Sequence, residues 1–585
     1  MIGTHPPLRR PSRLLASRAS GRGDRALIAA GRTLAAFLAW ASFAGGALAQ
    51  SRVVEEVLVE QSRIVERFSP PPVKGSASLR VPDVVEPIPA ELAARGGFVL
   101  RAVRVEGATA LGEPELRPLW ENMIGRLTEV SDLVELTDRM ESRYRQSGIL
   151  AVAVVPVQDF SGGEARIVVF DRSFIQTIET RGDHPGLRDR LDPYIRRLVA
   201  LQPLRLAEVE RILLLMSDMA GLNIEASLRR PEQPGNGGAL TLDIAFQKRV
   251  VRVSLDDRGT DEVGPVQAFA TYQENDLLGL LESTTLTGVT IPNQPRELLF
   301  GQLAQDFPVG SNGLHVGYRL GATRSEPGGD LADLDLQVAS LSGELYASYA
   351  VLRTIDHSVF GRIGLATRDT DVDVPGQRLS RDRYRWLTLG VAAEHETGIG
   401  PLAVQAEYLH GLDAFDATDE GASQASRSAA EPDFRILRGG ATLTLPLSGW
   451  LTAIGRLEGQ YAFGALPADV QMSFGGDPFG RAFDSGAASG DSGIMGGIEV
   501  EAATGAPFDG VLGTAVYGFA DHGAFWFQGD DRPDTRETLG SVGAGARASL
   551  EAGLLVEATL AVPIEYGSGG EDTGARVFLA VRKRF

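Results

Sequence analysis

The last ten residues, Arg576-Val577-Phe578-Leu579-Ala580-Val581-Arg582-Lys583-Arg584-Phe585, decide the fold because their side chains alternate in polarity. One face of the expected strand is apolar and the other is basic: Val577, Leu579, Val581 and Phe585 against Arg576, Arg582 and Arg584. We interpret Phe585, which closes this strand, as a C-terminal signal that the outer-membrane assembly machinery recognises. The segment therefore predicts a strand of a transmembrane β-barrel.

Upstream of this strand, the same period of two continues back to about residue 248. It is clearest at 334–338, 387–394, 402–408, 442–447 and 556–562. Such strands could also form a soluble sandwich or propeller, with the apolar side as the core. Here the second side carries small and polar residues (Gly, Ala, Thr, Gln and Glu), as expected where strands face lipid outside and water inside. We therefore expect residues 248–585 to form a transmembrane β-barrel.

Composition excludes several classes of protein. The 585 residues carry 57 basic and 76 acidic side chains, for a net charge of −19, which argues against a nucleic-acid binder. The absence of cysteine excludes disulfides, thiol catalysis and thiolate metal sites. The mean hydropathy of −0.04 resembles that of a soluble protein, but alternating barrel strands also average to neutrality.

The first 49 residues have the features of an export signal. Several arginines precede an uncharged run at 33–50, which ends on Ala47-Leu48-Ala49, a pattern that signal peptidase reads. A membrane anchor is the alternative, but the apolar part is too short to span a bilayer. We expect a signal peptide at 1–49, with cleavage after Ala49.

Two further segments precede the folded domains. Residues 51–68 place apolar side chains at helical spacing among charged ones, which predicts an amphipathic helix with Val54, Val57, Leu58, Ile64 and Val65 on its apolar face. Residues 69–97 are rich in proline and predict an extended linker. A disordered leader is the alternative interpretation of both segments.

Residues 98–247 contain one pattern of elements twice. In 98–171 the expected order is a strand (98–105), two helices (113–124 and one capped by Ser131) and two strands (150–157 and 164–170). In 172–247 the expected strands are 174–180, 222–228 and 240–246, with helices at 187–199 and 207–219. Two tandem units of β-α-α-β-β order therefore precede the barrel.

These segments together resemble the two-partner secretion transporters, the hemolysin secretion/activation proteins of the POTRA-plus-barrel outer-membrane superfamily. The resemblance implies a plug helix (51–68), a linker (69–97), two periplasmic α+β POTRA domains, POTRA 1 (98–171) and POTRA 2 (172–247), and a barrel of about 16 antiparallel strands (248–585). The barrel entrance, Val253-Ser254-Leu255-Asp256-Asp257-Arg258-Gly259, and the later Asn275-Asp276-Leu277-Leu278-Gly279 resemble the signatures of the first barrel strands in this family.

A more specific resemblance lies in Phe474-Gly475-Gly476-Asp477-Pro478-Phe479-Gly480-Arg481-Ala482-Phe483, which is similar to the sixth-loop signature of the family. The resemblance implies that this loop folds into the lumen, with Gly475 and Gly476 in the motif, Arg481 at the tip and Phe483 as its aromatic residue. It also implies an acidic partner on the barrel wall, which Phe519-Ala520-Asp521-His522-Gly523 supplies as Asp521. Ala482 stands where glycine is usual.

Other motifs do not support catalysis. Gly490-Asp491-Ser492-Gly493 resembles a serine-protease nucleophile motif, but no histidine lies in a supporting context. Glu394-His395-Glu396 lacks the second histidine of a helical zinc site. We expect the acidic segment 411–433 to be a solvated extracellular loop, with a cation site as an alternative. We expect no enzyme activity, no cofactor and no metal.

The resemblance implies a transporter of the bacterial outer membrane that captures an unfolded exoprotein with its POTRA domains. The exoprotein, an adhesin or cytolysin encoded nearby, would pass through the barrel pore without ATP, since the periplasm supplies none, and could be activated on the way. Other expected partners are the lipid bilayer with its lipopolysaccharide and the outer-membrane assembly machinery. Two alternatives stay open: an insertase of the same superfamily, and a passive porin with periplasmic binding modules.

Overall fold

The computed structural model describes residue 58 and residues 77–80, 96–171, 175–181, 186–229, 238–529, 536–566 and 574–585. The expected signal peptide and most of the expected amphipathic helix lie outside these residues, including Val54, Val57, Ile64 and Val65. Leu58 is described: it is helical and only 2% exposed, as expected for the apolar face of a packed helix. In the described part of the chain, no helix has both the length and the apolarity to cross a bilayer.

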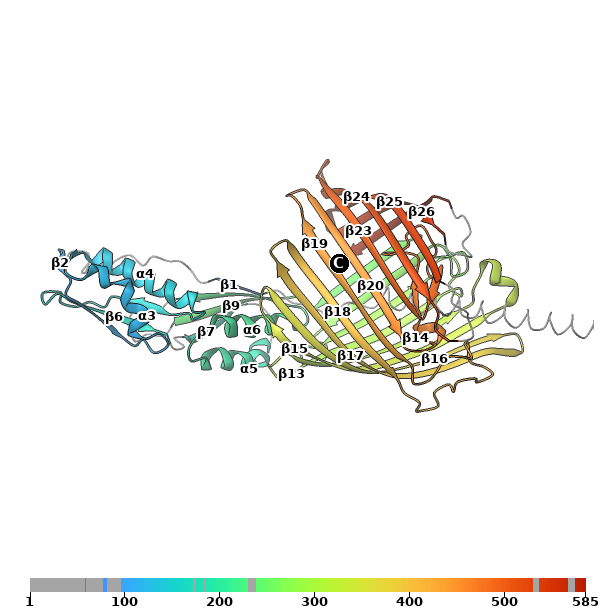
Figure 1. The fold of residues 1–585 in the computed structure, drawn as a ribbon, viewed down its shortest axis with the longest axis horizontal. Coiled ribbons are helices and arrows are strands. Elements are labelled where there is room, and N and C mark those ends of the chain that lie inside the picture. Colours follow the sequence, from blue (N-terminus) through green and yellow to red (C-terminus); the bar gives the residue numbers. More distant parts are fainter. Residues whose placement is uncertain are drawn as a thin grey trace, which may run out of the picture. The chain divides into compact units, whose positions relative to one another are not determined.

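POTRA 1 contains three paired strands and one long helix (Figure 1). Its elements are β2 (Phe98–Val99), β3 (Ala102–Glu106), α3 (Glu113–Leu116), the 3-10 helices η1 (Arg117–Leu119) and η2 (Glu121–Met123), β4 (Leu127–Thr128), α4 (Val130–Gln146), β5 (Val152–Val154) and β6 (Glu164–Phe170). The sheet order is β3-β6-β5, with β3 parallel and β5 antiparallel to β6. A separate small sheet pairs β2 with β4.

Three expectations for POTRA 1 need correction. The helix expected at 113–124 is broken into three short turns, because Pro118 lacks a backbone donor. The strand expected at 98–105 is divided, because Leu100 donates to the carbonyl of Arg126 and so leaves the main sheet. Helix α4 is capped by Glu129, whose N–H donates to Asp132, and not by Ser131.

A buried carboxylate holds POTRA 1 together. Asp171 is 0% exposed and accepts hydrogen bonds from the backbone N–H groups of Thr109 and Ala110, both at 2.6 Å. It also accepts the hydroxyl of Tyr144 on α4, at 3.1 Å. Burial, together with the charge of Asp171, raises the pKa of Tyr144 well above its usual range, so the phenol stays a donor. Asp171 thus joins a loop, the long helix and the end of β6.

POTRA 2 repeats the order of elements, as expected. It contains β7 (Ile175–Arg181), α5 (Leu187–Ala200), α6 (Leu206–Ser217), β8 (Leu222–Arg229) and β9 (Gly238–Phe246). The apolar faces of both helices pack with the sheet in one core: Leu191, Leu198, Ile212, Met216, Ile224 and Leu242, each at most 1% exposed.

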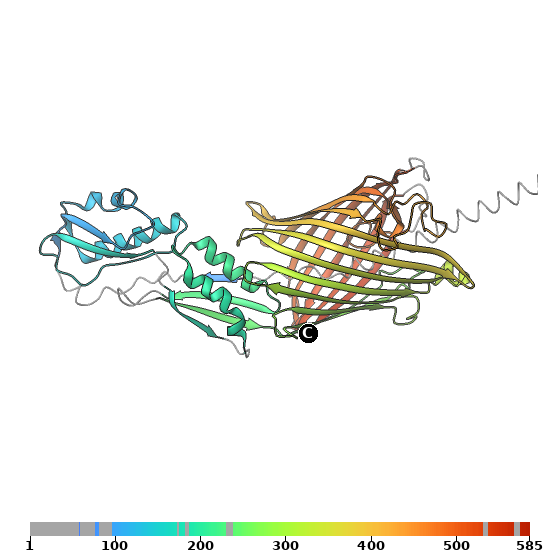
Figure 2. The same cartoon turned by 90° about the horizontal axis from the view of Figure 1, so that it is seen from below.

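The linker adds a strand to POTRA 2. Strand β1 (Ala77–Arg80) pairs in parallel with β8, so the sheet order is β1-β8-β9-β7. Its register runs from Ala77 opposite Ile224 to Arg80 opposite Ser227. Part of the expected extended linker therefore occupies the edge of the POTRA 2 sheet (Figure 2).

POTRA 2 also contacts the turns of the barrel that follow it. Asp218, at the end of α6, accepts two hydrogen bonds from the Arg353 guanidinium, at 2.8 and 2.9 Å, and both side chains are 7% exposed. Tyr194 on α5 donates to the carbonyl of Gly310 at 3.2 Å. Burial raises the pKa of Tyr194 to about 12, which keeps this donor protonated.

Sixteen antiparallel strands close into the barrel. They are β10 (Arg249–Asp256), β11 (Gln267–Asn275), β12 (Ser283–Thr290), β13 (Leu299–Val309), β14 (Leu314–Ser325), β15 (Gln337–Arg353), β16 (His357–Val374), β17 (Gln377–Thr397), β18 (Gly400–Gly411), β19 (Arg435–Pro446), β20 (Leu451–Ala462), β23 (Ser492–Gly505), β24 (Val511–Trp526), β25 (Arg536–Leu550), β26 (Leu554–Glu565) and β27 (Arg576–Arg584). The alternation expected at 334–338 begins too early, because 3-10 helix η3 (Gly329–Leu334) precedes β15.

The two faces of the barrel differ as alternation predicts. Leu345, Leu365 and Leu387 lie side by side on three neighbouring strands and are 63%, 44% and 39% exposed, which is typical of a lipid-facing belt. The neighbouring positions face inward, where Arg362 ion-pairs with Glu344 at 2.5 Å. Neutral mean hydropathy is thus the average of an apolar exterior and a charged interior.

The first and last strands close the barrel over a short seam. Strand β10 pairs with β27 from Arg252 opposite Arg584 to Asp256 opposite Ala580. Beyond these pairs, the N–H of Phe585 donates to the carbonyl of Val251 at 2.9 Å, and the N–H of Leu579 donates to Asp257 at 2.7 Å. The final residues of the chain therefore complete the wall.

Candidate functional site: the loop tip against the barrel wall

The segment between β20 and β23 (463–491) folds back against the inner wall. A small hairpin, β21 (Met472–Phe474) with β22 (Ala488–Gly490), supports its tip. Glycine is required at the start of the tip: Gly475 has φ +124°, and a Cβ there would overlap the carbonyl oxygen of Asp484. Gly476 also has a positive φ, and its N–H donates to the carbonyls of Gly480 and Phe483. These bonds fold the tip into a compact turn.

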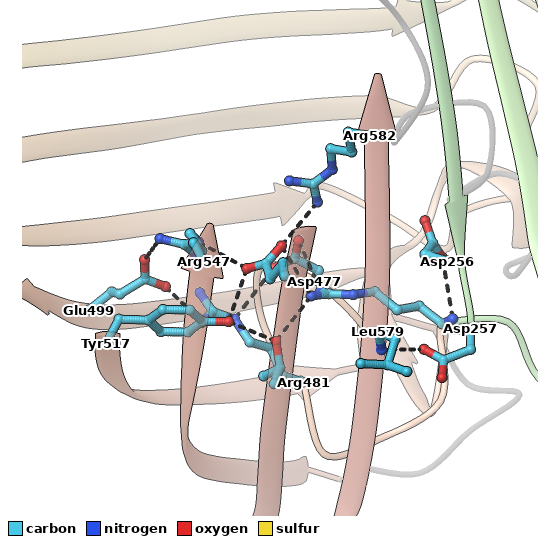
Figure 3. A network of polar contacts seen from close by, with 12 residues as sticks. Asp256, Asp257, Asp477, Arg481, Glu499, Tyr517, Arg547, Leu579 and Arg582 are labelled. Atoms are coloured by element: carbon cyan, nitrogen blue, oxygen red, sulfur yellow. Dashed lines mark hydrogen bonds and ion pairs between the residues drawn. The ribbon is translucent and has the colours of Figure 1, made fainter. Parts of the chain in front are cut away.

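Arg481 lies in the tip and is 6% exposed. Its guanidinium ion-pairs with Glu499 on β23 at 2.7 Å and with Asp477 of the tip at 3.3 Å. It also stacks over the ring of Phe519 on β24, 4.1 Å from the ring centroid. The tip arginine is therefore held by the two carboxylates of Asp477 and Glu499, which Figure 3 shows, and by the ring of Phe519.

Asp521 contacts the tip in a different way from the one expected. Its carboxylate accepts the backbone N–H of Gly480 at 2.8 Å and the hydroxyl of Ser541 at 2.6 Å. The described ion-pair partners of Arg481 are Glu499 and Asp477, so the expected Arg481–Asp521 ion pair needs correction. The reason is geometric: Asp521 faces the backbone of the tip at Gly480 and Arg481, and the guanidinium of Arg481 turns to Glu499 and Asp477.

Arg481 belongs to a larger charged network. Glu499 also binds Arg547 on β25 at 2.8 Å, and Arg547 continues to Glu557 on β26 at 2.9 Å. Arg258, which follows β10, reaches Asp477 at 3.1 Å and Glu557 at 3.7 Å. Figure 3 shows this network, which links the tip to both sides of the seam where the barrel closes.

Aromatic side chains surround the tip. Phe483 lies 6.1 Å from Phe474 between ring centroids, and Phe479 is 1% exposed in the same cluster. Ala482 is 0% exposed and has a negative φ, so alanine fits where the family usually has glycine. The motif residues Gly475, Gly476, Arg481 and Phe483 are thus brought together.

Two rings of the wall lie over glycines. Phe519 is directly opposite Gly543, and Tyr517 is opposite Gly545, on the neighbouring strand β25. A Cβ at Gly543 would lie 2.5 Å from the Phe519 ring. On the inner side of the same rings lie Arg481, over Phe519, and Arg547, over Tyr517, each within 4.1 Å of a centroid. Each arginine therefore rests on a ring that rests on a glycine.

Sequence reasoning missed Glu499, Arg547 and Glu557. Alternation could have oriented Glu499, because Ile498 and Val500 beside it are 53% and 39% exposed to lipid. Alternation could not have paired these charges, because the partners lie on different strands, with register that only the folded barrel determines.

The other motifs resolve as structural features. In the acidic segment 411–433, Asp413, Asp416, Asp419, Glu420 and Asp433 are exposed, as expected for a solvated loop, whereas Ser426, Arg427 and Ala430 are at most 6% exposed. The reason is packing against neighbouring loops, with Arg427 paired to Asp491 of the Gly490–Gly493 tetrapeptide. In the described part of the chain, no three His, Asp or Glu side chains form a metal-binding group.

Comparisons with known proteins agree on one family. The haemolysin secretion/activation protein family ShlB/FhaC/HecB matches residues 246–548, and the ShlB-type POTRA domain matches residues 98–171. The outer membrane transporter CdiB of Dickeya dadantii (strain 3937) is 22% identical over 458 residues, which cover 76% of each chain.

Two solved structures share the fold. CdiB from Escherichia coli has a TM-score of 0.66 at 18% identity, and CdiB from Acinetobacter baumannii has 0.57 at 15%. Both alignments cover 92% of this chain and 98% of the other. The barrel lies in the bacterial outer membrane, with the POTRA region in the periplasm. The chain belongs to the haemolysin secretion/activation proteins of the ShlB/FhaC/HecB family, the two-partner secretion transporters of the outer membrane.

Proposed function

We propose that this transporter captures one unfolded exoprotein in the periplasm and exports it through the barrel without ATP. The family membership supports an exported protein partner, and the similar CdiB proteins are outer-membrane transporters. The observation that carries the proposal is the charged network of the loop tip, since Arg481 holds the loop against the inner wall. A passive porin would have no use for such a loop.

The POTRA domains supply sheet edges at which an extended client can add a strand. Strand β5 is an edge strand of the POTRA 1 sheet, and β8 of POTRA 2 is paired to the linker. A client strand could add to an edge of the POTRA 1 sheet, where the N–H of Ala153 on β5 already donates to Glu141, and at POTRA 2 it would compete with the chain's own linker.

The role of the tip is tested with Arg481→Ala. The chain is expressed with its candidate exoprotein, the large exported β-helical protein that we expect a neighbouring gene to encode, and exoprotein in the medium is measured. We expect about a tenfold fall in secretion, since ~1.4 kcal/mol lost from the tip's resting position changes its population tenfold. Arg438→Ala is the matched control, because Arg438 also ion-pairs within the barrel, with Glu407 at 2.8 Å, but lies outside the loop.

Unchanged secretion by a folded Arg481→Ala barrel, checked by heat-dependent migration on a gel, contradicts the role of the tip. The insertase alternative predicts instead that a client barrel is inserted in the membrane and none appears in the medium. An activity assay of exoprotein secreted by the wild type, against exoprotein refolded alone, decides whether export also activates the client.

The plug role proposed for residues 51–68 has its own test. Deletion of these residues is expected to raise the single-channel conductance in a planar bilayer, because the helix would no longer occupy the lumen. Equal conductance with and without residues 51–68 would reject the plug.

A further inference from the structure

Asp491 is a buried charge that the loop-tip network does not use. It lies at the base of loop 6 (463–491), immediately before β23, and is 0% exposed. Its carboxylate binds the guanidinium of Arg427 at 2.5 Å and accepts backbone N–H groups from Leu466 at 3.1 Å and Gln528 at 2.6 Å. One side chain therefore contacts three separate segments.

Arg427 makes the matching set of contacts from the other side. It lies in loop 5 (412–434), is 4% exposed, and donates to the carbonyls of Leu466 at 3.2 Å and Gln528 at 2.7 Å. Leu466 belongs to loop 6, and Gln528 lies near the start of the connection between β24 and β25, which we call loop 7. The ion pair and its four backbone contacts thus join loops 5, 6 and 7.

These loops lie at the extracellular end of the barrel. Strand β10 leaves the periplasmic POTRA 2, so the connections after β10 and after every second strand emerge on the opposite side. Further contacts pack the same loops onto the wall: Ser426 donates its backbone N–H to Asp382 on β17 at 3.0 Å, and Arg368 on β16 ion-pairs with Asp469 of loop 6 at 3.5 Å. The loops are therefore packed together and do not project separately into solvent.

We propose that Arg427 and Asp491 form an extracellular latch, which joins loops 5, 6 and 7 at rest and opens when a client leaves the barrel. The second half of this statement rests on the proposed export function. Loop 6 is held at both ends, by Arg481 at its tip and by Asp491 at its base, so the latch residues are positioning residues for the loop that carries the tip.

An ion pair suits a latch that must open and close again. The attraction between two buried charges roughly balances the cost of removing them from water, so such a pair defines one arrangement without making it very stable. When the loops separate, water hydrates both charges again. An apolar contact of the same size would instead expose apolar surface to water, which is unfavourable. The pair therefore specifies the closed arrangement at a small cost for opening.

Protease access to loop 5 tests the resting latch. Arg427 is the only basic residue between Gly411 and Arg435, so trypsin added to intact cells can cut loop 5 only after Arg427. We expect the wild type to resist, and Asp491→Ala to be cut there at least tenfold faster. Asp373→Ala is the matched control, because Asp373 pairs with Arg378 within the single β16–β17 hairpin at 2.9 Å.

Equal resistance of the wild type and Asp491→Ala overturns the latch at rest. The Asp491→Ala barrel must keep its heat-dependent migration on a gel, which shows that it still folds. Asp491→Asn adds a second reading, because the amide oxygen can still accept one N–H but carries no charge for Arg427. We expect its rate of cleavage to lie between those of the wild type and Asp491→Ala.

A reversible cross-link tests the opening. The chain has no cysteine, so Arg427→Cys/Asp491→Cys provides two thiols that a short bismaleimide with a reducible disulfide can join. We expect the cross-link to reduce export of the neighbouring exoprotein at least tenfold, and reductant to restore it. The control pair, Asp373→Cys/Arg378→Cys, is cross-linked within one hairpin and should export at an unchanged rate.

The outcomes separate the latch from the export function. Normal export by the cross-linked latch variant, with normal export by the cross-linked control, overturns the latch and leaves the export proposal intact. No export by either variant or by the wild type rejects the export proposal itself. Block and recovery confined to the latch variant support both.

Discussion

POTRA 1 and POTRA 2 share one order of elements but use their buried carboxylates differently. In POTRA 1, Asp171 satisfies groups of its own domain, including Tyr144 of the long helix. In POTRA 2, the buried carboxylate is Asp218, and its arginine partner, Arg353, belongs to the barrel. In this respect POTRA 1 is internally closed, whereas POTRA 2 is completed by the barrel it contacts. Elsewhere POTRA 1 does bond to POTRA 2, because the N–H of Leu150 donates to the carbonyl of Leu204.

The sheets of POTRA 1 and POTRA 2 also differ in what covers their edge strands. Strand β5 of POTRA 1 pairs with β6 over only three residues, Val152–Val154. The N–H of Ala153 donates to Glu141 on α4, and Ile149, just before β5, forms an isolated bridge with Arg205. Strand β8 of POTRA 2 is eight residues long and pairs with linker strand β1. A long edge is a good template for a foreign strand, and here the chain covers it with its own linker. The two repeats therefore differ in how the rest of the chain covers their sheet edges.

The largest effect is expected from Arg353→Ala, which breaks the dependence of POTRA 2 on the barrel. Asp218 would stay buried without its arginine, at a cost of about 3–5 kcal/mol. Pulse proteolysis should show POTRA 2 released from the barrel and cut more readily, with POTRA 1 unaffected. Arg211→Ala, which removes a half-buried cation that donates to the carbonyl of Ala350, should cost no more than about 1 kcal/mol. Equal effects of both substitutions would contradict the special role of Arg353.

Asp171→Ala tests the internal closure of POTRA 1 and should rank second. It leaves the Tyr144 hydroxyl and two backbone N–H groups without their acceptor, at a cost of about 2–3 kcal/mol. The unfolding of POTRA 1, followed by hydrogen exchange of α4 in the full chain, should shift by this amount while POTRA 2 keeps its protection. Asp138→Ala on the exposed face of α4 is the control, with a change within about 0.5 kcal/mol.

The cover on the POTRA 2 edge is tested with Ser78→Pro/Leu79→Pro. Two adjacent prolines remove both backbone donors at the centre of β1, so β1 cannot stay paired with β8. Amide exchange at 222–229 should become roughly tenfold faster, for ~1.4 kcal/mol of lost pairing. Exchange in β9, on the other side of β8, serves as the internal reference. Unchanged exchange in β8 would mean that β1 does not protect it.

The smallest change in stability is expected from Leu127→Ser in POTRA 1. Leu127 is 73% exposed and lies directly opposite Val99, which is 49% exposed, so the two form an unburied apolar pair. Serine should change the free energy of unfolding by less than about 0.5 kcal/mol. If POTRA 1 meets the client first, secretion should slow even though stability does not change, and a rate equal to the wild type would contradict this order of capture.

Local patterns predicted the strands well where one face meets lipid. Strands β17, β18 and β26 include the alternating runs at 387–394, 402–408 and 556–562. Predictions were weaker where tertiary contacts decide. Pro118 broke a helix that its apolar spacing had favoured, and the pairing of β1 with β8 depends on an edge far away in sequence.

The same division holds for the site. The motif around Arg481 located the tip, because the arginine and its glycines lie close together in sequence. Its carboxylate partner, Glu499, depends on how deeply the loop enters the barrel, and local sequence does not encode that depth. Asp491 lay inside a motif that resembles a protease nucleophile, and only the fold shows its contacts with Arg427.

The glycines beneath Phe519 and Tyr517 show one effect of the high glycine content of the barrel, which is to leave space for large side chains inside it. Each missing methyl group lets a ring sink toward the wall, so the space gained belongs to the lumen. Gly543→Ala would raise the Phe519 ring and, with it, the guanidinium of Arg481. At the level of the loop tip, the room left in the lumen therefore depends on Gly543 and Gly545 carrying no side chain.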